Sequence, residues 1–144
     1  MEKIILDVQV ILKYPDILKV VKEGTEIIIS TEVVSELQTL MEPEIFMNVL
    51  ELIKKNKSIR LVNAYDSKYD INPDMFSFMD LNDKSLFRIG YGETDLGALK
   101  LVKIATFDHD IIRNAVESYL GTINEVELKI LILACLIFSR QLMI

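Results

Sequence analysis

Cysteine and histidine are nearly absent from this chain of 144 residues. Its one cysteine, Cys135, lies inside an apolar run, and its one histidine is His109. A single cysteine excludes an intramolecular disulfide, and its apolar surroundings argue against a thiolate metal site. We read His109 as an exposed turn residue. The single cysteine indicates a protein of the reducing cytoplasm.

Long hydrophobic runs are also missing. The most apolar segment, Ile130 to Phe138, has nine residues between Lys129 and Ser139, which is too short to span a bilayer. The apolar stretch near the N-terminus is interrupted by Asp7, so it does not suit a signal peptide. We expect residues 124–144 to form a hydrophobic C-terminal helix, packed on the domain or on a second subunit, and no stable membrane insertion.

Positive charge is scarce. The chain has 16 Lys and Arg against 22 Asp and Glu, a net charge of −6, which argues against a broad basic surface for nucleic acid. Any phosphate contact must therefore be local. One dense basic stretch remains as a candidate, although it also suits a solvated helix end. It consists of Lys54, Lys55, Lys57 and Arg60.

The pattern of apolar residues predicts one domain of alternating strands and helices. Apolar, β-branched segments predict strands at 3–6, 26–29, 59–62 and 103–107. Helices are expected after Pro15, after Ser30, from Pro43, over 96–101, over 111–116 and from Glu125 to about Leu142. Residues 63–82 are expected to form a long surface loop. The predicted fold class is α/β, a three-layer α/β/α sandwich with a mostly parallel central sheet.

Acidic residues follow two of the predicted strands. Asp7 and Asp108 each end a strand, Glu36 lies among the apolar positions of a helix, and Asp95 opens another. Ligands bind at the carboxyl ends of parallel strands, so these carboxylates could converge. Carboxylates brought together repel, and Mg²⁺ or Mn²⁺ is the usual remedy. Each residue also has an ordinary alternative: Asp7 as a cap, Glu36 as an exposed helix residue, Asp95 as a partner of the helix dipole and Asp108 as a turn residue.

Four short motifs, in order along the chain, resemble those of PIN-domain ribonucleases. The first is Ile4-Ile5-Leu6-Asp7, and the second is Val33-Val34-Ser35-Glu36-Leu37. The third is Gly92-Glu93-Thr94-Asp95, and the fourth is Thr106-Phe107-Asp108-His109-Asp110. Together they place a PIN-like domain at residues 1–123.

The resemblance implies a metal-dependent RNA endonuclease, either a toxin of a toxin and antitoxin pair or an RNA-processing factor. Asp7, Glu36, Asp95 and Asp108 would then be the catalytic residues and hold Mg²⁺ or Mn²⁺ ions that activate water against RNA. Glu93 and Asp110 are auxiliary candidates, and the basic stretch supplies candidate RNA contacts. The expected partners are RNA, a second copy in a homodimer or higher homo-oligomer, and an antitoxin or other protein.

Two positions depart from the family pattern. The family usually has Asp-Thr-Asn or Asp-Thr-Ser in its first motif, where this chain has Val8 and Gln9 after Asp7. The alternative is therefore a catalytically weakened PIN-like domain that serves as an RNA-binding or protein-interaction scaffold. A third interpretation, a receiver-like regulatory domain with a single functional Asp, would leave Glu36 and Asp95 far from Asp7.

Overall fold

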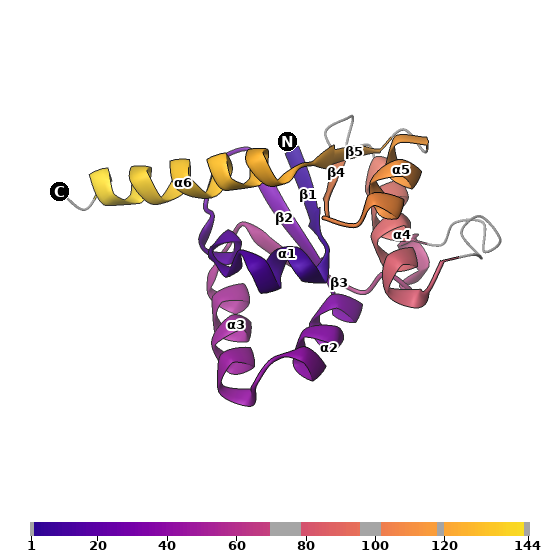
Figure 1. Ribbon diagram of the computed structural model, residues 1–144, viewed down its shortest axis with the longest axis horizontal. Coiled ribbons are helices and arrows are strands. Elements are labelled where there is room, and N and C mark those ends of the chain that lie inside the picture. Colours follow the sequence, from indigo (N-terminus) through magenta and orange to yellow (C-terminus); the bar gives the residue numbers. More distant parts are fainter. Residues whose placement is uncertain (1, 70–78, 96–101, 118–119, 143–144) are drawn as a thin grey trace.

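The computed structural model describes residues 2–69, 79–95, 102–117 and 120–142, without the side chains of Asp95 and residues 138–142. The elements are β1 (Glu2–Leu6), α1 (Val8–Lys13), the 3-10 helix η1 (Pro15–Lys19), β2 (Thr25–Ser30), α2 (Thr31–Leu40), α3 (Pro43–Lys55), β3 (Ile59–Val62), the 3-10 helix η2 (Ser67–Tyr69), α4 (Leu81–Asp95), β4 (Val102–Ala105), α5 (His109–Glu117), β5 (Gly121–Ile123) and α6 (Glu125–Leu142). Figure 1 shows their arrangement.

The five strands form one parallel sheet in the order β3-β2-β1-β4-β5. The chain builds outward from β1 to β3 on one side, then returns to place β4 on the other side of β1. The boundary between β1 and β4 is therefore the point where the order of the strands reverses. In open parallel sheets, this boundary opens a crevice at the carboxyl ends of the two strands.

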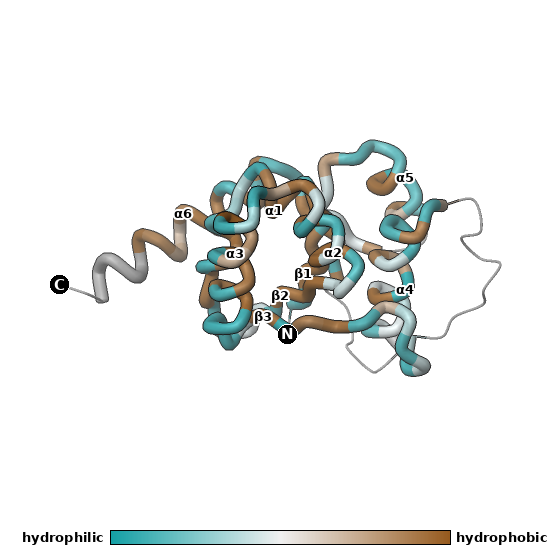
Figure 2. Tube along the Cα trace, turned by 90° about the horizontal axis from the view of Figure 1, so that it is seen from below, coloured by the Kyte–Doolittle hydropathy of each residue, from teal (hydrophilic) through white to brown (hydrophobic). Residues whose placement is uncertain are grey.

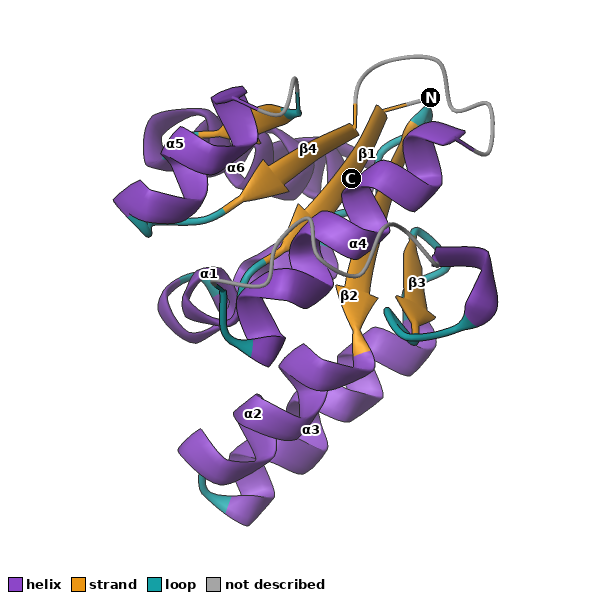
Figure 3. Ribbon diagram, turned by 90° about the vertical axis from the view of Figure 1, so that its right-hand side faces the viewer, coloured by secondary structure: helices purple, strands orange, loops and turns teal. Residues whose placement is uncertain are grey.

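Alternate residues of the strands serve two separate hydrophobic cores. Ile4 and Leu6 face a core that includes residues of α1, η1, α2, α3 and α6. Ile5 and Ile104 face the opposite core, with residues of α4 and α5. Figure 3 shows α4 lying across one face of the sheet, and Figure 2 shows the hydrophobic character of β1 and β2. The result is a three-layer α/β/α sandwich, as the sequence predicts.

Local sequence signals explain several helix starts. The side chain of Ser30 accepts a hydrogen bond from the Val33 amide and caps α2, and Pro43 occupies the first turn of α3. The Asn124 side chain accepts from the Glu127 amide at 2.9 Å, as expected for the cap of α6. The four predicted strands correspond to β1–β4, with β4 ending at Ala105.

Other segments differ from the prediction. The segment after Pro15 forms only a short 3-10 helix, and the sequence pattern does not predict α1 or β5. The expected helix over 96–101 lies outside the described residues. Helix α4 instead begins at Leu81, inside the expected surface loop, because the apolar side of this helix contains fully buried Leu86, Phe87 and Ile89.

A buried ion-pair network fixes the end of α4. Glu93 is 1% exposed, and its carboxylate accepts hydrogen bonds from Lys3 at 3.1 Å, from Tyr69 at 3.2 Å, and from Arg60. Arg60 also pairs with Glu26 at 2.8 Å. These contacts join α4 to β1, β2 and β3. A carboxylate so buried requires such partners, since desolvation of an unpaired charge is costly.

Glu93→Gln should destabilise the protein, because the neutral amide leaves Lys3 and Arg60 partly buried without their shared counter-ion. We expect the free energy of unfolding in urea to fall by about 2 kcal/mol, below the full cost of a buried pair because Arg60 is partly exposed. Glu51→Gln, which removes an exposed pair with Lys55, is the control and should change it by less than about 0.5 kcal/mol.

Candidate metal-binding acidic pocket

A pocket opens where β1 and β4 end, with a volume of about 360 Å³. Its lining is Asp7, Val8, Gln9, Glu36, Asp80, Asn82, Asp83, Phe107 and Asp108. Five of these nine residues are carboxylates, and they follow two strands, lie in α2, or lie at and just before the start of α4. We call this site the acidic pocket.

Thr106 ties the two strand ends together. Its hydroxyl donates to Oδ2 of Asp7 at 2.6 Å and accepts from the Asp108 amide at 3.1 Å. The other carboxylate oxygen of Asp7 accepts from the Val8 amide at 2.8 Å, so that Asp7 also caps α1. Asp108 accepts from the Asp110 amide at 2.8 Å, at the start of α5. Both carboxylates are thus oriented by helix starts that follow adjacent strands.

The start of α4 supplies the other side of the pocket. Asp80 accepts a hydrogen bond from the Asp83 amide at 2.9 Å, and the Asn82 side chain donates to Glu36 at 2.9 Å. Glu36 is thereby connected to α4 across the pocket mouth. Sequence reasoning missed Asp80, Asn82 and Asp83 as site residues. The signal was present, because an acidic residue followed three positions later by another is typical of a helix start.

The carboxyl groups disturb one another's protonation. Burial raises the pKa of Asp83 to about 6, with further contributions from Asp80, Asp7, Asp108 and Glu36. Burial also raises the pKa of Asp7, although its hydrogen bonds from Thr106 and Val8 oppose the effect. The pKa of Glu36 is raised by burial and by the charges of Asp7 and Asp80. Such shifts are typical of functional sites, where like charges are held together.

The structure brings together three of the four predicted carboxylates, Asp7, Glu36 and Asp108. Asp95 is the last residue of α4, whereas Asp83 lies in its first turn. At a rise of about 1.5 Å per residue, the two backbones are about 18 Å apart along the helix. The backbone of Asp95, which the sequence predicts to be a site residue, therefore lies at the end of α4 away from the pocket, because this helix reaches the pocket by its first turn.

The other predicted residues lie elsewhere. Glu93 is occupied in the network with Lys3 and Arg60, and Asp110 pairs with Arg113 at 3.0 Å on the surface. Lys54, Lys55 and Lys57 are exposed at or just after the end of α3, before β3 begins. They therefore lie at the amino edge of the sheet, opposite the acidic pocket. His109 is exposed, as expected.

The donor set suits a hard divalent cation, since all five ionisable groups are carboxylates. Asp7, Glu36, Asp83 and Asp108 would hold the ion, and Asp80 could share it. Within the described residues, no three His, Cys, Asp or Glu side chains stand close enough together to coordinate one ion as they are placed. To coordinate one ion, the side chains of the pocket would have to move closer together. Repulsion between the ionised carboxylates opposes this movement while no cation is bound.

Metal-free protein should lose stability as the pH rises. A carboxyl whose pKa is raised on folding binds protons more tightly in the folded state. Its contribution is therefore favourable below the unfolded value of 3.8 and is lost as the pH rises through about 6. Urea unfolding in a chelating buffer should show lower stability at pH 7.5 than at pH 4.5.

Asp83→Asn should remove part of this dependence and raise stability at pH 7.5 by about 1 kcal/mol, after allowance for solvent screening. Asp16→Asn, at an exposed site paired with Lys19, is the control. A stability that is equal at both pH values, or an Asp83→Asn protein no more stable than the wild type at pH 7.5, would contradict the electrostatic account of the pocket.

The comparisons with known proteins bear on the fold. No protein-family model matches the chain, and no curated protein matches its sequence. Among solved structures, the PIN domain of T. brucei RRP44 is similar with a TM-score of 0.61 and 16% identity, covering 99% of this chain and 85% of that chain. At this identity the likeness establishes the fold alone. The chain therefore has a PIN-like fold, in agreement with the resemblance in its sequence motifs.

Proposed function

We propose that this protein is a metal-dependent ribonuclease that hydrolyses RNA phosphodiesters at the acidic pocket. The observation that carries the proposal is the gathering of Asp7, Glu36, Asp80, Asp83 and Asp108 around one pocket at the reversal of the strand order. A PIN-like fold supports it. When bound, Mg²⁺ or Mn²⁺ would supply an activated water and neutralise charge on the phosphate.

The chain's own residues prepare the pocket for that role. Thr106 and the Val8 amide hold Asp7 in one orientation, and Asn82 holds Glu36. Thr106 contributes a hydroxyl next to Asp7, although Val8 occupies the position where the family motif has one. Orienting hydrogen bonds of this kind typically change metal affinity or activity tenfold or more. This arrangement offsets part of the departure at Val8 and Gln9.

RNA needs cationic contacts near the acidic pocket, and the pocket rim at Phe107 offers them. Lys13 Nζ lies 5.4 Å from the Phe107 ring centre, and Tyr14 packs edge-on against Phe107 at 6.0 Å. Lys129 of α6 lies 5.8 Å from the Tyr14 ring. Aromatic rings can stack bases and lysines can contact phosphates. We therefore assign RNA contact to Lys13 and Lys129, in place of Lys54, Lys55, Lys57 and Arg60.

The alternative is a domain that binds RNA or protein without efficient cleavage. Two observations favour it. Among the described residues, no three His, Cys, Asp or Glu side chains lie close enough together to hold one ion. The apolar Val8 also lines the pocket. Calorimetry with Mn²⁺ separates the two functions. A wild type that binds neither Mn²⁺ alone nor Mn²⁺ with RNA present, yet retains RNA, is the scaffold.

Substitution of the pocket carboxylates tests catalysis. Asp7→Asn and Asp83→Asn should each lower Mn²⁺-dependent cleavage of a mixed single-stranded RNA by more than about 100-fold, because each removes a metal ligand while leaving the fold intact. Asp95→Asn is the matched control and should cleave at the wild-type rate. Unchanged cleavage by Asp7→Asn would refute the site. Loss of cleavage in Asp95→Asn would show that Asp95 is a site residue, as the sequence predicts.

Substitution of the lysines tests the RNA path. Binding of a labelled single-stranded RNA is measured by fluorescence anisotropy in a chelating buffer, so that no cleavage occurs. Lys13→Ala with Lys129→Ala should weaken binding about tenfold at low salt and reduce the salt slope by roughly 1.4, the value for two phosphate contacts. Lys54→Ala with Lys55→Ala removes the same charge at the opposite edge and should bind as the wild type does. Weaker RNA binding by the Lys54 and Lys55 variant, with unchanged binding by the Lys13 and Lys129 variant, would instead place the RNA contact at the end of α3.

A further inference from the structure

One face of α6 is aliphatic and exposed. The helix packs on its own domain through buried Leu128 and Ile132, and Lys13 and Tyr14 hold its first turn through Glu125. A second stripe consists of Val126, Ile130, Leu133 and Ile137, which are 65%, 61%, 58% and 48% exposed. We call it the α6 stripe. Figure 1 shows α6 extending past the rest of the domain.

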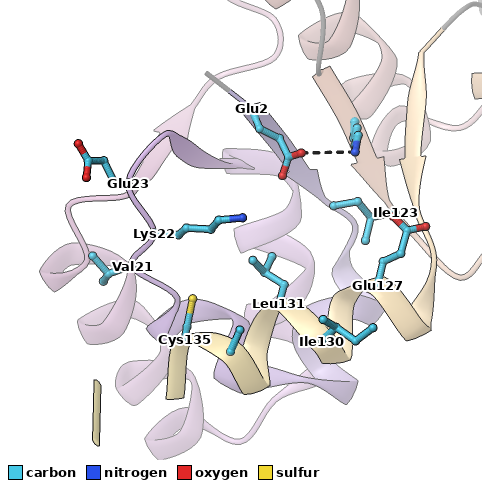
Figure 4. Close-up of a pocket in the computed structure, with 11 residues that line it drawn as sticks. Glu2, Val21, Lys22, Glu23, Ile123, Glu127, Ile130, Leu131 and Cys135 are labelled. Carbon is cyan, nitrogen blue, oxygen red and sulfur yellow. Dashed lines mark ion pairs between the residues drawn. The ribbon is translucent and has the colours of Figure 1, made fainter. Parts of the chain in front are cut away.

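A groove adjoins the α6 stripe. It has a volume of about 610 Å³, and Ile130, Leu131 and Ala134 of α6 form one wall. Val21, which is 64% exposed, also lines the groove. Glu2, which lines this space, forms an ion pair with Lys103. Figure 4 shows Lys22 and Glu23 across from the helix. Ile130 belongs to both, so the groove borders the stripe along α6.

We infer that a second copy of this chain occupies the α6 stripe, through an antiparallel pairing of the two α6 helices. Four aliphatic side chains at this exposure present roughly 300–400 Å² of apolar surface, at the size of the largest patches on monomers. Stable dimers bury about 800 Å² on each partner. The stripe supplies about half of this area, and the adjoining groove with Val21 extends it.

The spacing of the stripe fits a second copy of the same chain as the partner. The positions 126, 130, 133 and 137 read the same in both directions about a point between Ile130 and Leu133. A two-fold interface requires such self-complementarity. In the antiparallel pair, Ile130 faces Leu133 of the partner subunit, and the Val126 position faces that of Ile137. The spacing is also that of a coiled-coil seam.

The charges beside the stripe agree with this direction. Glu127 and Lys129 flank the stripe near one end of the helix. A parallel pair would bring each of these charges level with its own copy. In the antiparallel pair, the Glu127 position lies opposite that of Leu136, and the Lys129 position lies opposite that of Ala134. Like charges are therefore kept apart.

Sedimentation equilibrium of the full chain from about 1 to 100 µM tests the inference. The wild type should be a dimer, and its melting temperature should rise with concentration. Ile130→Glu with Leu133→Glu places like charges opposite each other and should weaken association at least about tenfold, while the circular dichroism and Mn²⁺ affinity stay unchanged. Val116→Glu, at an equally exposed aliphatic residue of α5 (64%), should remain dimeric.

A charge-swapped variant reports the direction of pairing. Ile130→Glu with Leu133→Lys sets opposite charges face to face only in the antiparallel pair, so this variant should associate more strongly than the double Glu variant. It also serves if the double Glu variant does not fold. A wild type that is monomeric up to 100 µM, or a double Glu variant that stays dimeric, overturns the inference. Association of the swapped variant no stronger than that of the folded double Glu variant overturns the antiparallel direction.

Discussion

The hydrogen bonding of β1 to β4 is the constraint on which the acidic pocket depends. Residues about a hundred positions apart in sequence become neighbours because these two strands pair in parallel, with Leu6 beside Ala105. The Asp7 amide donates to the Ala105 carbonyl at 3.0 Å, and the Thr106 hydroxyl completes the connection. Helices α1 and α5 start where these strands end. Their capping groups and the pocket carboxylates are therefore the same side chains, Asp7 and Asp108.

This arrangement has an energetic cost that the rest of the domain must offset. Burial and mutual repulsion raise the pKa values of Asp7, Glu36 and Asp83, which means that ionised pocket carboxylates oppose folding near neutral pH. Two complete apolar cores, one on each face of the sheet, and the Glu93 network provide the stability that permits it. A bound divalent cation would attract the carboxylates that otherwise repel one another. The free energy that these groups cost on folding would then be recovered as affinity for the ion.

Different parts of the sheet carry different surfaces. The carboxyl edge gathers the acidic pocket, with Lys13 and Lys129 near its rim, although the whole chain has a net charge of −6. The amino ends of β1 and β4 adjoin the apolar groove and the exposed side of α6. None of the described helices is long and apolar enough to cross a membrane. We propose that a second copy of the chain covers the apolar surface of α6, which adjoins this groove and not the acidic pocket.

The sequence by itself determined the fold class, the strands β1 to β4, the helices after Ser30, Pro43 and Asn124, and three of the residues that line the acidic pocket. These follow from short-range signals, namely runs of β-branched residues, helix caps and acidic residues at strand ends. Only the tertiary structure decided that Asp83 lies in the pocket while Asp95 lies at the far end of α4, that Glu93 is neutralised by Arg60, and that the basic end of α3 faces away. Each of these outcomes depends on which elements pack side by side and on which end of a helix reaches the edge of the sheet. The spacing of residues along the chain does not determine either of them.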